Sequence, residues 1–152
     1  MDATQNNFWM RLALNEAKKA KEKGEVPVGA VIVLNEKVIG LGHNLSIKNN
    51  DPTSHAEIEA IRNASFKLKN YRLSHAILYV TLEPCTMCFG AIVHSRIKHI
   101  FFGAADPKSG VCGTCENLSK KEYFNHRPKI TGNILKEECS KLLKDFFRAK
   151  RV

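Results

Sequence analysis

Two kinds of hydrophobic pattern occur along this chain, one with the period of a helix and one typical of β-strands. From Gln5 to Lys23 the apolar residues recur on one side of a period of about 3.6 residues, and Gly24 ends the segment. This pattern predicts an N-terminal helix. Residues 28–34 and 37–41 are instead rich in β-branched residues and are separated by a turn at Asn35-Glu36, which predicts a pair of strands.

Beyond a polar loop from His43 to Thr53, the chain alternates between the two patterns. Helices are expected over residues 55–67, 86–94 and 137–148, strands over 77–82, 98–103 and 129–131, and a glycine-containing loop over 104–117. Strands that alternate with helices indicate an α/β sandwich with at least some parallel strand pairing.

Composition narrows the class of protein. A chain of 152 residues, 43% of them apolar, is expected to fold as a single domain over residues 1–152. No stretch approaches the roughly 18 apolar residues of a membrane span, so no membrane partner is expected. No signal peptide is visible, and five cysteines, an odd count, favour metal binding in a reducing compartment. We therefore expect a cytoplasmic protein.

Net charge suggests a partner. Lys and Arg number 24 against 15 Asp and Glu, a formal balance of +9. A basic protein associates readily with polyanions, of which nucleic acid is the obvious candidate. A lysine-rich composition also arises from genome bias, so charge alone leaves both interpretations open.

Two short motifs carry the candidate chemistry, His55-Ala56-Glu57 and Pro84-Cys85-Thr86-Met87-Cys88. One imidazole and two sulfurs form a Zn²⁺ ligand set, and three protein ligands leave the open fourth position of a catalytic site. Both motifs fall at predicted helix N-termini, which lower the pKa of a cysteine and favour the metal-binding thiolate. Glu57 is not needed as a ligand and is placed to move protons. The pair matches the H-x-E…P-C-x-x-C signature of zinc nucleobase deaminases.

Other interpretations remain open for the same residues. Ser54 and Glu57 have the spacing of a helix capping box. A second pair, Cys112 and Cys115, would form a zinc ribbon with the first, although the gap exceeds the usual 15–20 residues or so. That alternative makes the protein a structural or nucleic-acid-binding module and leaves His55 and Glu57 without a role.

The similarity extends beyond the zinc motifs, from about residue 8 to about residue 148. The segments that carry it are Pro27-Val28-Gly29-Ala30, Gly42-His43-Asn44, Asp51-Pro52-Thr53-Ser54, Thr81-Leu82-Glu83-Pro84-Cys85, Ile92-Val93-His94-Ser95-Arg96, Gly103-Ala104-Ala105-Asp106-Pro107-Lys108 and Phe124-Asn125-His126-Arg127. They resemble the bacterial tRNA-specific adenosine deaminase family, within the cytidine and deoxycytidylate deaminase superfamily. The first half is shared with cytosine and guanine deaminases, whereas the second half resembles the tRNA enzymes. Cys112-Gly113-Thr114-Cys115 departs from the family pattern.

This resemblance implies a three-layer α/β/α cytidine-deaminase-like sandwich with a five-stranded mixed sheet. It implies a homodimer with one Zn²⁺ per subunit that hydrolyses adenosine to inosine at the wobble position of a tRNA anticodon. Asn44 would hydrogen-bond the flipped base, and Pro27, Val28 and Ala56 would form the pocket wall. The implied contacts to the anticodon stem-loop are Asp106, Pro107, Lys108, Ser109, Asn125, Phe146, Phe147 and Arg148.

These implied contacts have structural alternatives. Asp106-Pro107 would also initiate a turn. Neighbouring helical positions diverge by about 100°, so at least one of Phe146 and Phe147 is expected in the core. The cations near the C-terminus fit either phosphate contacts or a solvated helix face; they are Lys141, Lys144, Arg148, Lys150 and Arg151. The second enzyme hypothesis is a free guanine or purine deaminase, with its pocket closed over a small ligand.

Overall fold

A computed structural model describes residues 2–150 and contains one five-stranded sheet, in the order β2-β1-β3-β4-β5. The strands are β1 (Gly29–Leu34), β2 (Lys37–His43), β3 (Ile77–Leu82), β4 (His99–Ala104) and β5 (Lys129–Thr131). β1 pairs antiparallel with β2 and β3, whereas β3 with β4 and β4 with β5 are parallel. The expected mixed sheet is confirmed, and its parallel part comes from the segment after residue 55.

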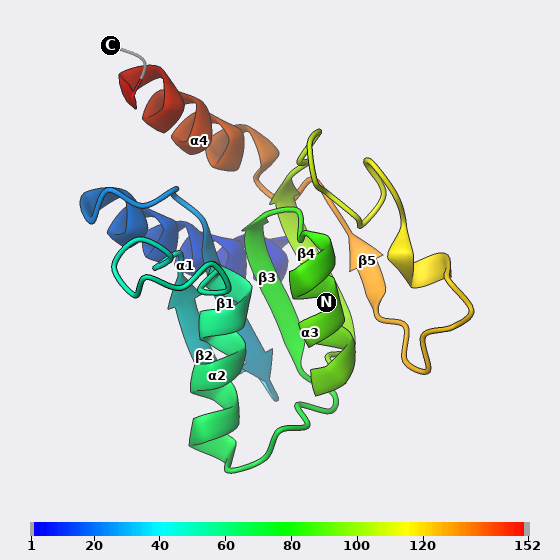
Figure 1. Ribbon diagram of the computed structural model, residues 1–152. Coiled ribbons are helices and arrows are strands. Elements are labelled where there is room, and N and C mark those ends of the chain that lie inside the picture. Colours follow the sequence, from blue (N-terminus) through cyan, green and yellow to red (C-terminus); the bar gives the residue numbers. More distant parts are fainter. Residues whose placement is uncertain (1, 151–152) are drawn as a thin grey trace.

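Helices cover both faces of the sheet (Figure 1). The helices are α1 (Ala3–Glu22), α2 (Ala56–Leu68), α3 (Thr86–Ser95) and α4 (Lys136–Lys150), with a short 3-10 helix, η1 (Leu118–Lys120). α2 and α3 lie on one face, and α1 lies on the other, where the Arg11–Glu138 ion pair joins it to α4. The three-layer α/β/α prediction is confirmed, with element bounds within two residues of those expected.

Two strand glycines let the helices approach the sheet closely. A β-carbon at Gly29 would overlap the backbone of α1 at Ala13, and one at Gly42 would overlap the backbone of α2 at Ala56. Because neighbouring strand residues point to opposite faces, each glycine serves one helix layer. α2 is thereby seated with its first turn directly over the end of β2.

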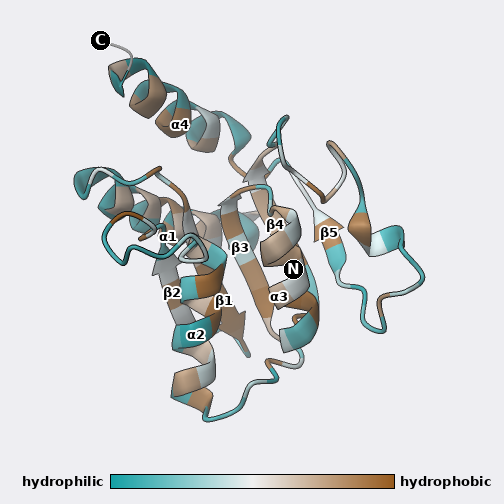
Figure 2. Ribbon diagram, viewed as in Figure 1, coloured by the Kyte–Doolittle hydropathy of each residue, from teal (hydrophilic) through white to brown (hydrophobic). Residues whose placement is uncertain are grey.

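The core lies between these layers. The inner strands β1, β3 and β4 are buried along nearly their whole length. Much of β3 has the brown colour of apolar residues in Figure 2. Tyr79 of β3 stacks on Phe101 of β4 with ring centroids 4.9 Å apart, and its hydroxyl donates to Asn6 of α1. Within residues 2–150 no helix is long and apolar enough to cross a membrane.

Candidate active site

The first turns of α2 and α3 bring the two sequence motifs together. His55 is the N-cap residue of α2 and Cys85 is the N-cap residue of α3, both with extended backbone. Cys88 follows in the first turn of α3 and is buried. The ligand atoms of these three side chains lie within 4.8 Å of one another. Among the residues that the structure describes, they form the only such group of three histidine, cysteine or acidic ligands.

The spacing of these atoms fits zinc. His55 Nδ1 lies 3.7 Å from Cys85 Sγ and 3.5 Å from Cys88 Sγ. Tetrahedral bonds of about 2.0–2.1 Å to nitrogen and 2.3 Å to sulfur place such atoms roughly 3.6 Å apart. Hydrogen bonds from Cys88 and His55 lower the pKa of Cys85 to about 4, so that it favours the thiolate that binds metal. The two nitrogen–sulfur separations are therefore those that the metal requires.

Glu57 is a buried carboxyl group beside this cluster. Burial raises the pKa of Glu57 to about 7, against the opposing effect of its hydrogen bonds. The capping-box alternative is wrong, because His55 rather than Ser54 is the N-cap residue and α2 has no side-chain cap. Ser54 instead donates to Asp51 at 3.1 Å. Ser54 and Glu57 therefore do not form a capping box.

A cavity of about 220 Å³ opens next to the cluster. The predicted residues that line it are Val28, Asn44, His55, Glu57, Cys85, Asp106 and Ser109. Sequence reasoning missed three further lining residues, Val26, Leu82 and Glu83. Two signals were available: Val26 shares the alternation of Val28 in an extended segment, and Leu82-Glu83 ends the strand that leads to Cys85.

Hydrogen bonds to residues 25 and 28 fix the backbone of the segment that begins at Asn44. The backbone amide of Asn44 donates to the Val28 carbonyl at 3.2 Å, and Asn44 lines the cavity together with Val28. The following loop is held by Glu25, a buried carboxylate that accepts hydrogen bonds from the amides of Ile47 and Lys48 at 3.1 and 2.8 Å. Pro27 and Ala56 are also buried, beside lining residues rather than among them, so their role as pocket wall stays a prediction.

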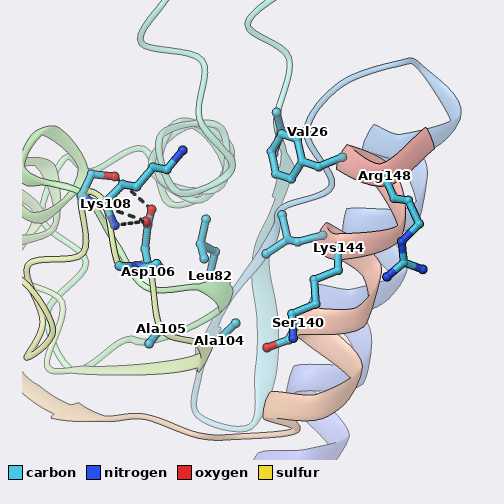
Figure 3. Close-up of a pocket in the computed structure, with 13 residues that line it drawn as sticks. Val26, Leu82, Ala104, Ala105, Asp106, Lys108, Ser140, Lys144 and Arg148 are labelled. Atoms are coloured by element: carbon cyan, nitrogen blue, oxygen red, sulfur yellow. Dashed lines mark hydrogen bonds between the residues drawn. The ribbon is translucent and has the colours of Figure 1, made fainter. Parts of the chain in front are cut away.

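A larger groove of about 610 Å³ continues from this cavity. The two share Val26, Leu82, Asp106 and Ser109. Figure 3 shows Asp106 and Lys108 on one side of the groove and Ser140, Lys144 and Arg148 of α4 on the other. Of the predicted contacts, the groove gathers Asp106, Pro107, Lys108, Ser109, Phe147 and Arg148, together with Lys144, one of the C-terminal cations left open between phosphate contact and solvated face; Ser140 and Leu143 were not predicted.

Comparison with known proteins agrees with this geometry. A model of the MafB19-like deaminase family matches residues 4–151. The tRNA-specific adenosine deaminase of Bacillus subtilis (strain 168) is 49% identical over 97% of this chain and 92% of the relative. That of Haemophilus influenzae is 52% identical over 93% of this chain and 83% of the relative. The chain belongs to the tRNA-specific adenosine deaminase family.

Solved structures place this family member among the deaminases. A structure from a study of A-to-I editing by tRNA:A34 deaminases has a TM-score of 0.87 and 43% identity, covering 90% of this chain and 99% of the other. A protein solved with bound 2,6-diaminopurine has a TM-score of 0.76 and 20% identity, covering 93% of this chain and 80% of the other, and shows the fold alone.

Two predicted RNA contacts of this deaminase lie elsewhere. The Phe146 side chain is 8% exposed and belongs to the core, whereas Phe147 is 43% exposed and lines the groove. Phe146 is therefore corrected to a core residue: adjacent helical positions diverge by about 100°, and only Phe147 of the two lines the groove. Asn125 accepts a hydrogen bond from Arg96 at 3.3 Å. Arg96 caps the C-terminal end of α3, opposite the end that carries Cys85, so Asn125 is not brought to the cavity of its own chain. Arg151 lies outside the described residues.

The second cysteine pair of this deaminase does not join the first. Cys112 is buried, whereas Cys115 is exposed with its sulfur 3.2 Å from the Pro107 carbonyl oxygen. Within residues 2–150 neither belongs to a metal-ligand group. The zinc-ribbon alternative is therefore wrong.

Proposed function

We propose that this protein hydrolyses adenosine to inosine at the wobble position of a tRNA anticodon, with one Zn²⁺ per subunit. The observation that carries the proposal is the convergence of His55, Cys85 and Cys88 with Glu57 at one cavity. Relatives that match nearly the whole chain are named as tRNA-specific adenosine deaminases, which supports the reaction and the substrate.

His55, Cys85 and Cys88 would hold the zinc, which supplies a Lewis acid and lowers the pKa of bound water toward about 7. The two N-cap positions aim the ligands at a common point and keep them at the positive ends of α2 and α3. The buried Cys88 closes the inner side of the cluster, so that the open side faces the cavity.

Glu57 moves the protons. Its carboxylate takes a proton from the attacking water and delivers it to N1 of adenine, which makes C6 more electrophilic. Oxygen then bonds to C6, Glu57 takes the remaining proton from the new C6 hydroxyl and gives it to the amine, and the C6–N bond breaks to release ammonia and leave the C6 carbonyl of inosine. The balance is adenosine plus water giving inosine plus ammonia. A single group serves both transfers because Glu57 lines the cavity beside His55 and Cys85.

Asn44 and two valines are suited to hold the base. The Asn44 amide both donates and accepts hydrogen bonds, which matches the mixed donors and acceptors of a purine edge. Val26 and Val28 give the cavity an apolar wall for the ring. A base from an anticodon loop is already partly unstacked, so its extrusion into the cavity costs less than from a duplex.

The groove is suited to the flanking nucleotides. Lys108 on one side, with Lys144 and Arg148 on the other, offers positive charge to phosphates, and Phe147 offers a partly exposed ring for stacking. A deaminase of free purines needs neither feature. The open connection from groove to cavity therefore favours an anticodon stem-loop over a small base.

The test compares ammonia release from an anticodon stem-loop, free adenosine and free guanine, at several salt concentrations. We expect turnover on the stem-loop that weakens as salt rises. Efficient, salt-insensitive deamination of free guanine would replace the RNA substrate with a free purine and leave the catalytic group intact.

We also propose that residues 1–152 form one deaminase domain that works as a homodimer in the cytoplasm, where tRNA is modified. The outward side of α3 supports the dimer, since Met87 is exposed there and Gly90 leaves open space for a partner. Light scattering should give twice the mass of the chain, and a monomer mass at working concentrations would contradict the dimer.

A further inference from the structure

Glu83 is a buried carboxylate that the reaction above does not use. It follows β3 directly and is separated from the ligand Cys85 by Pro84 alone. Its side chain is 2% exposed, yet it lines the cavity. A buried carboxylate needs hydrogen-bond donors to offset the lost contact with water. The donors therefore indicate what Glu83 does.

All of the hydrogen bonds that Glu83 accepts come from the segment after β4. The amide of Asp106 donates to one oxygen at 3.1 Å, and the amides of Cys112 and Thr114 donate to the other at 2.8 and 3.2 Å. The Thr114 hydroxyl donates to the first oxygen as well. Four donors fill the acceptor sites of a carboxylate, which has about four.

The segment is also shaped to admit the carboxyl group. A β-carbon at Gly110 would lie 2.5 Å from a Glu83 carboxylate oxygen, so only glycine leaves room there. The Gly110 amide donates back to the Asp106 carbonyl at 3.0 Å and closes the loop around the carboxylate. The backbone of residues 106–114 thus wraps one side chain from β3.

The same loop forms the side of the groove that is proposed to bind RNA. The Asp106 side chain accepts hydrogen bonds from the amides of Lys108 and Ser109 at 3.0 and 3.2 Å and from the Ser109 hydroxyl at 2.9 Å (Figure 3). Asp106 and Ser109 line both the cavity and the groove. A shift of the Asp106 amide would therefore move the wall of both together.

We propose that Glu83 is a positioning residue that ties the RNA-facing wall, residues 106–109, to the strand end that carries the cysteine ligands. The inference rests on the proposed function for its RNA readout. It also gives a role to the loop that carries the second cysteine pair, because the backbone amides of Cys112 and Thr114 and the Thr114 hydroxyl hold Glu83 without using the Cys112 sulfur.

The first test is Glu83→Gln in the zinc-loaded protein, assayed on an anticodon stem-loop. The new amide presents N–H groups to donors that need an acceptor, so the loop should loosen. We expect KM to rise about tenfold, kcat to fall less than about threefold, and zinc to stay at one per chain. Loss of zinc, or an equal loss of kcat with KM unchanged, would overturn the proposal.

Two milder variants protect this test against misfolding. Thr114→Val keeps the volume of the side chain but removes the hydroxyl, and should raise KM in the same direction by a smaller factor. Thr114→Ser keeps the hydroxyl and should behave as the wild type. If Thr114→Val and Thr114→Ser shared one KM, the hydrogen bond to Glu83 would have no part in positioning.

A readout independent of activity completes the test. Hydrogen exchange at the amides of Asp106, Cys112 and Thr114 should be slow in the wild type and faster in Glu83→Gln. The amides of Ile47 and Lys48, held by Glu25, serve as internal controls and should not change. Unchanged exchange at all five amides would disprove the positioning role. A wild type inactive on every RNA would instead disprove the proposed function, and the exchange result would still decide the role of Glu83.

Discussion

The chain contains two cysteine pairs of identical spacing, and the structure uses them in opposite ways. Cys85 and Cys88 turn their sulfurs toward His55 at the start of a helix. Cys112 and Cys115 lie in a loop, where the Cys112 amide donates to Glu83 and the Cys115 sulfur faces a carbonyl oxygen. Spacing alone therefore does not make a metal site. The strand, proline and helix N-terminus around the first pair, together with the histidine from α2, make the difference.

The two cysteine pairs lie in regions with different proposed functions, chemistry for the first and RNA binding for the second. The first pair belongs to the cluster beside Glu57, where bonds would be made and broken. The loop of the second pair holds the wall of the groove, where RNA would bind. Substitutions in the first region should act on turnover, and those in the second on affinity.

The largest effect is expected from Cys85→Ala or Cys88→Ala. Either change removes one of three protein ligands, so zinc and deamination should be lost together. Metal analysis of the purified variants, paired with ammonia release, checks this. An active variant that retained zinc would mean that the ligand set is wrong.

Glu57→Gln should separate metal binding from chemistry within the first region. The amide keeps the volume of the side chain but cannot carry a proton, so kcat should fall by about 10²–10⁴-fold while zinc stays bound. Single-turnover rates on the stem-loop measure the change. Near-normal turnover with zinc in place would leave Glu57 without a catalytic role.

Lys108→Ala and Arg148→Ala, on the two sides of the groove, should affect RNA affinity rather than turnover. Each should raise KM on the stem-loop, with kcat little changed. Each should also reduce the slope of log affinity against log salt by about 0.7 if it neutralises one phosphate. Lys37→Ala, an exposed lysine at the far end of β2 from Asn44, is the matched control. A slope equal to the wild type would remove the residue from the RNA contacts.

The double variant Cys112→Ser with Cys115→Ser should change least of the enzyme variants. Its backbone amides stay in place, so zinc content and KM should lie within about twofold of the wild type. Burying a hydroxyl at position 112 should cost about 1–3 kcal/mol of stability, which thermal unfolding measures. Release of zinc from this variant would overturn the contrast between the pairs.

The smallest effect separates the two sulfurs of the second pair. Burial raises the pKa of Cys112 to about 12, so at pH 8 almost none of its thiol is the reactive thiolate, whereas Cys115 is exposed. Iodoacetamide at pH 8 should label Cys115 well before Cys112 in the folded protein. Mass spectrometry of digested peptides reads the order, and equal labelling would show that Cys112 is not protected.

Sequence patterns were sufficient wherever the signal was local. The strand over residues 77–82 was predicted to the residue because five of its six residues are apolar or aromatic, and the cluster of His55, Cys85 and Cys88 followed from short motifs. Glu83 was missed because its donors lie far along the chain and nothing in the sequence marks the pairing. Which of Phe146 and Phe147 lies in the core could not be predicted, because the orientation of a helix about its axis is set by packing, which one-dimensional periodicity gives only coarsely.

Because α2 packs directly against Gly42, an alanine substitution at this position has the opposite effect to most alanine substitutions. At most positions alanine removes contacts, and the result measures what the side chain contributed. At Gly42 alanine adds a carbon where the backbone of Ala56 already lies, and that backbone sits between His55 and Glu57. This small substitution would therefore displace both the proposed metal ligand His55 and the proposed proton carrier Glu57. The position of the first turn of α2 in the active site thus depends on the absence of a side chain at Gly42.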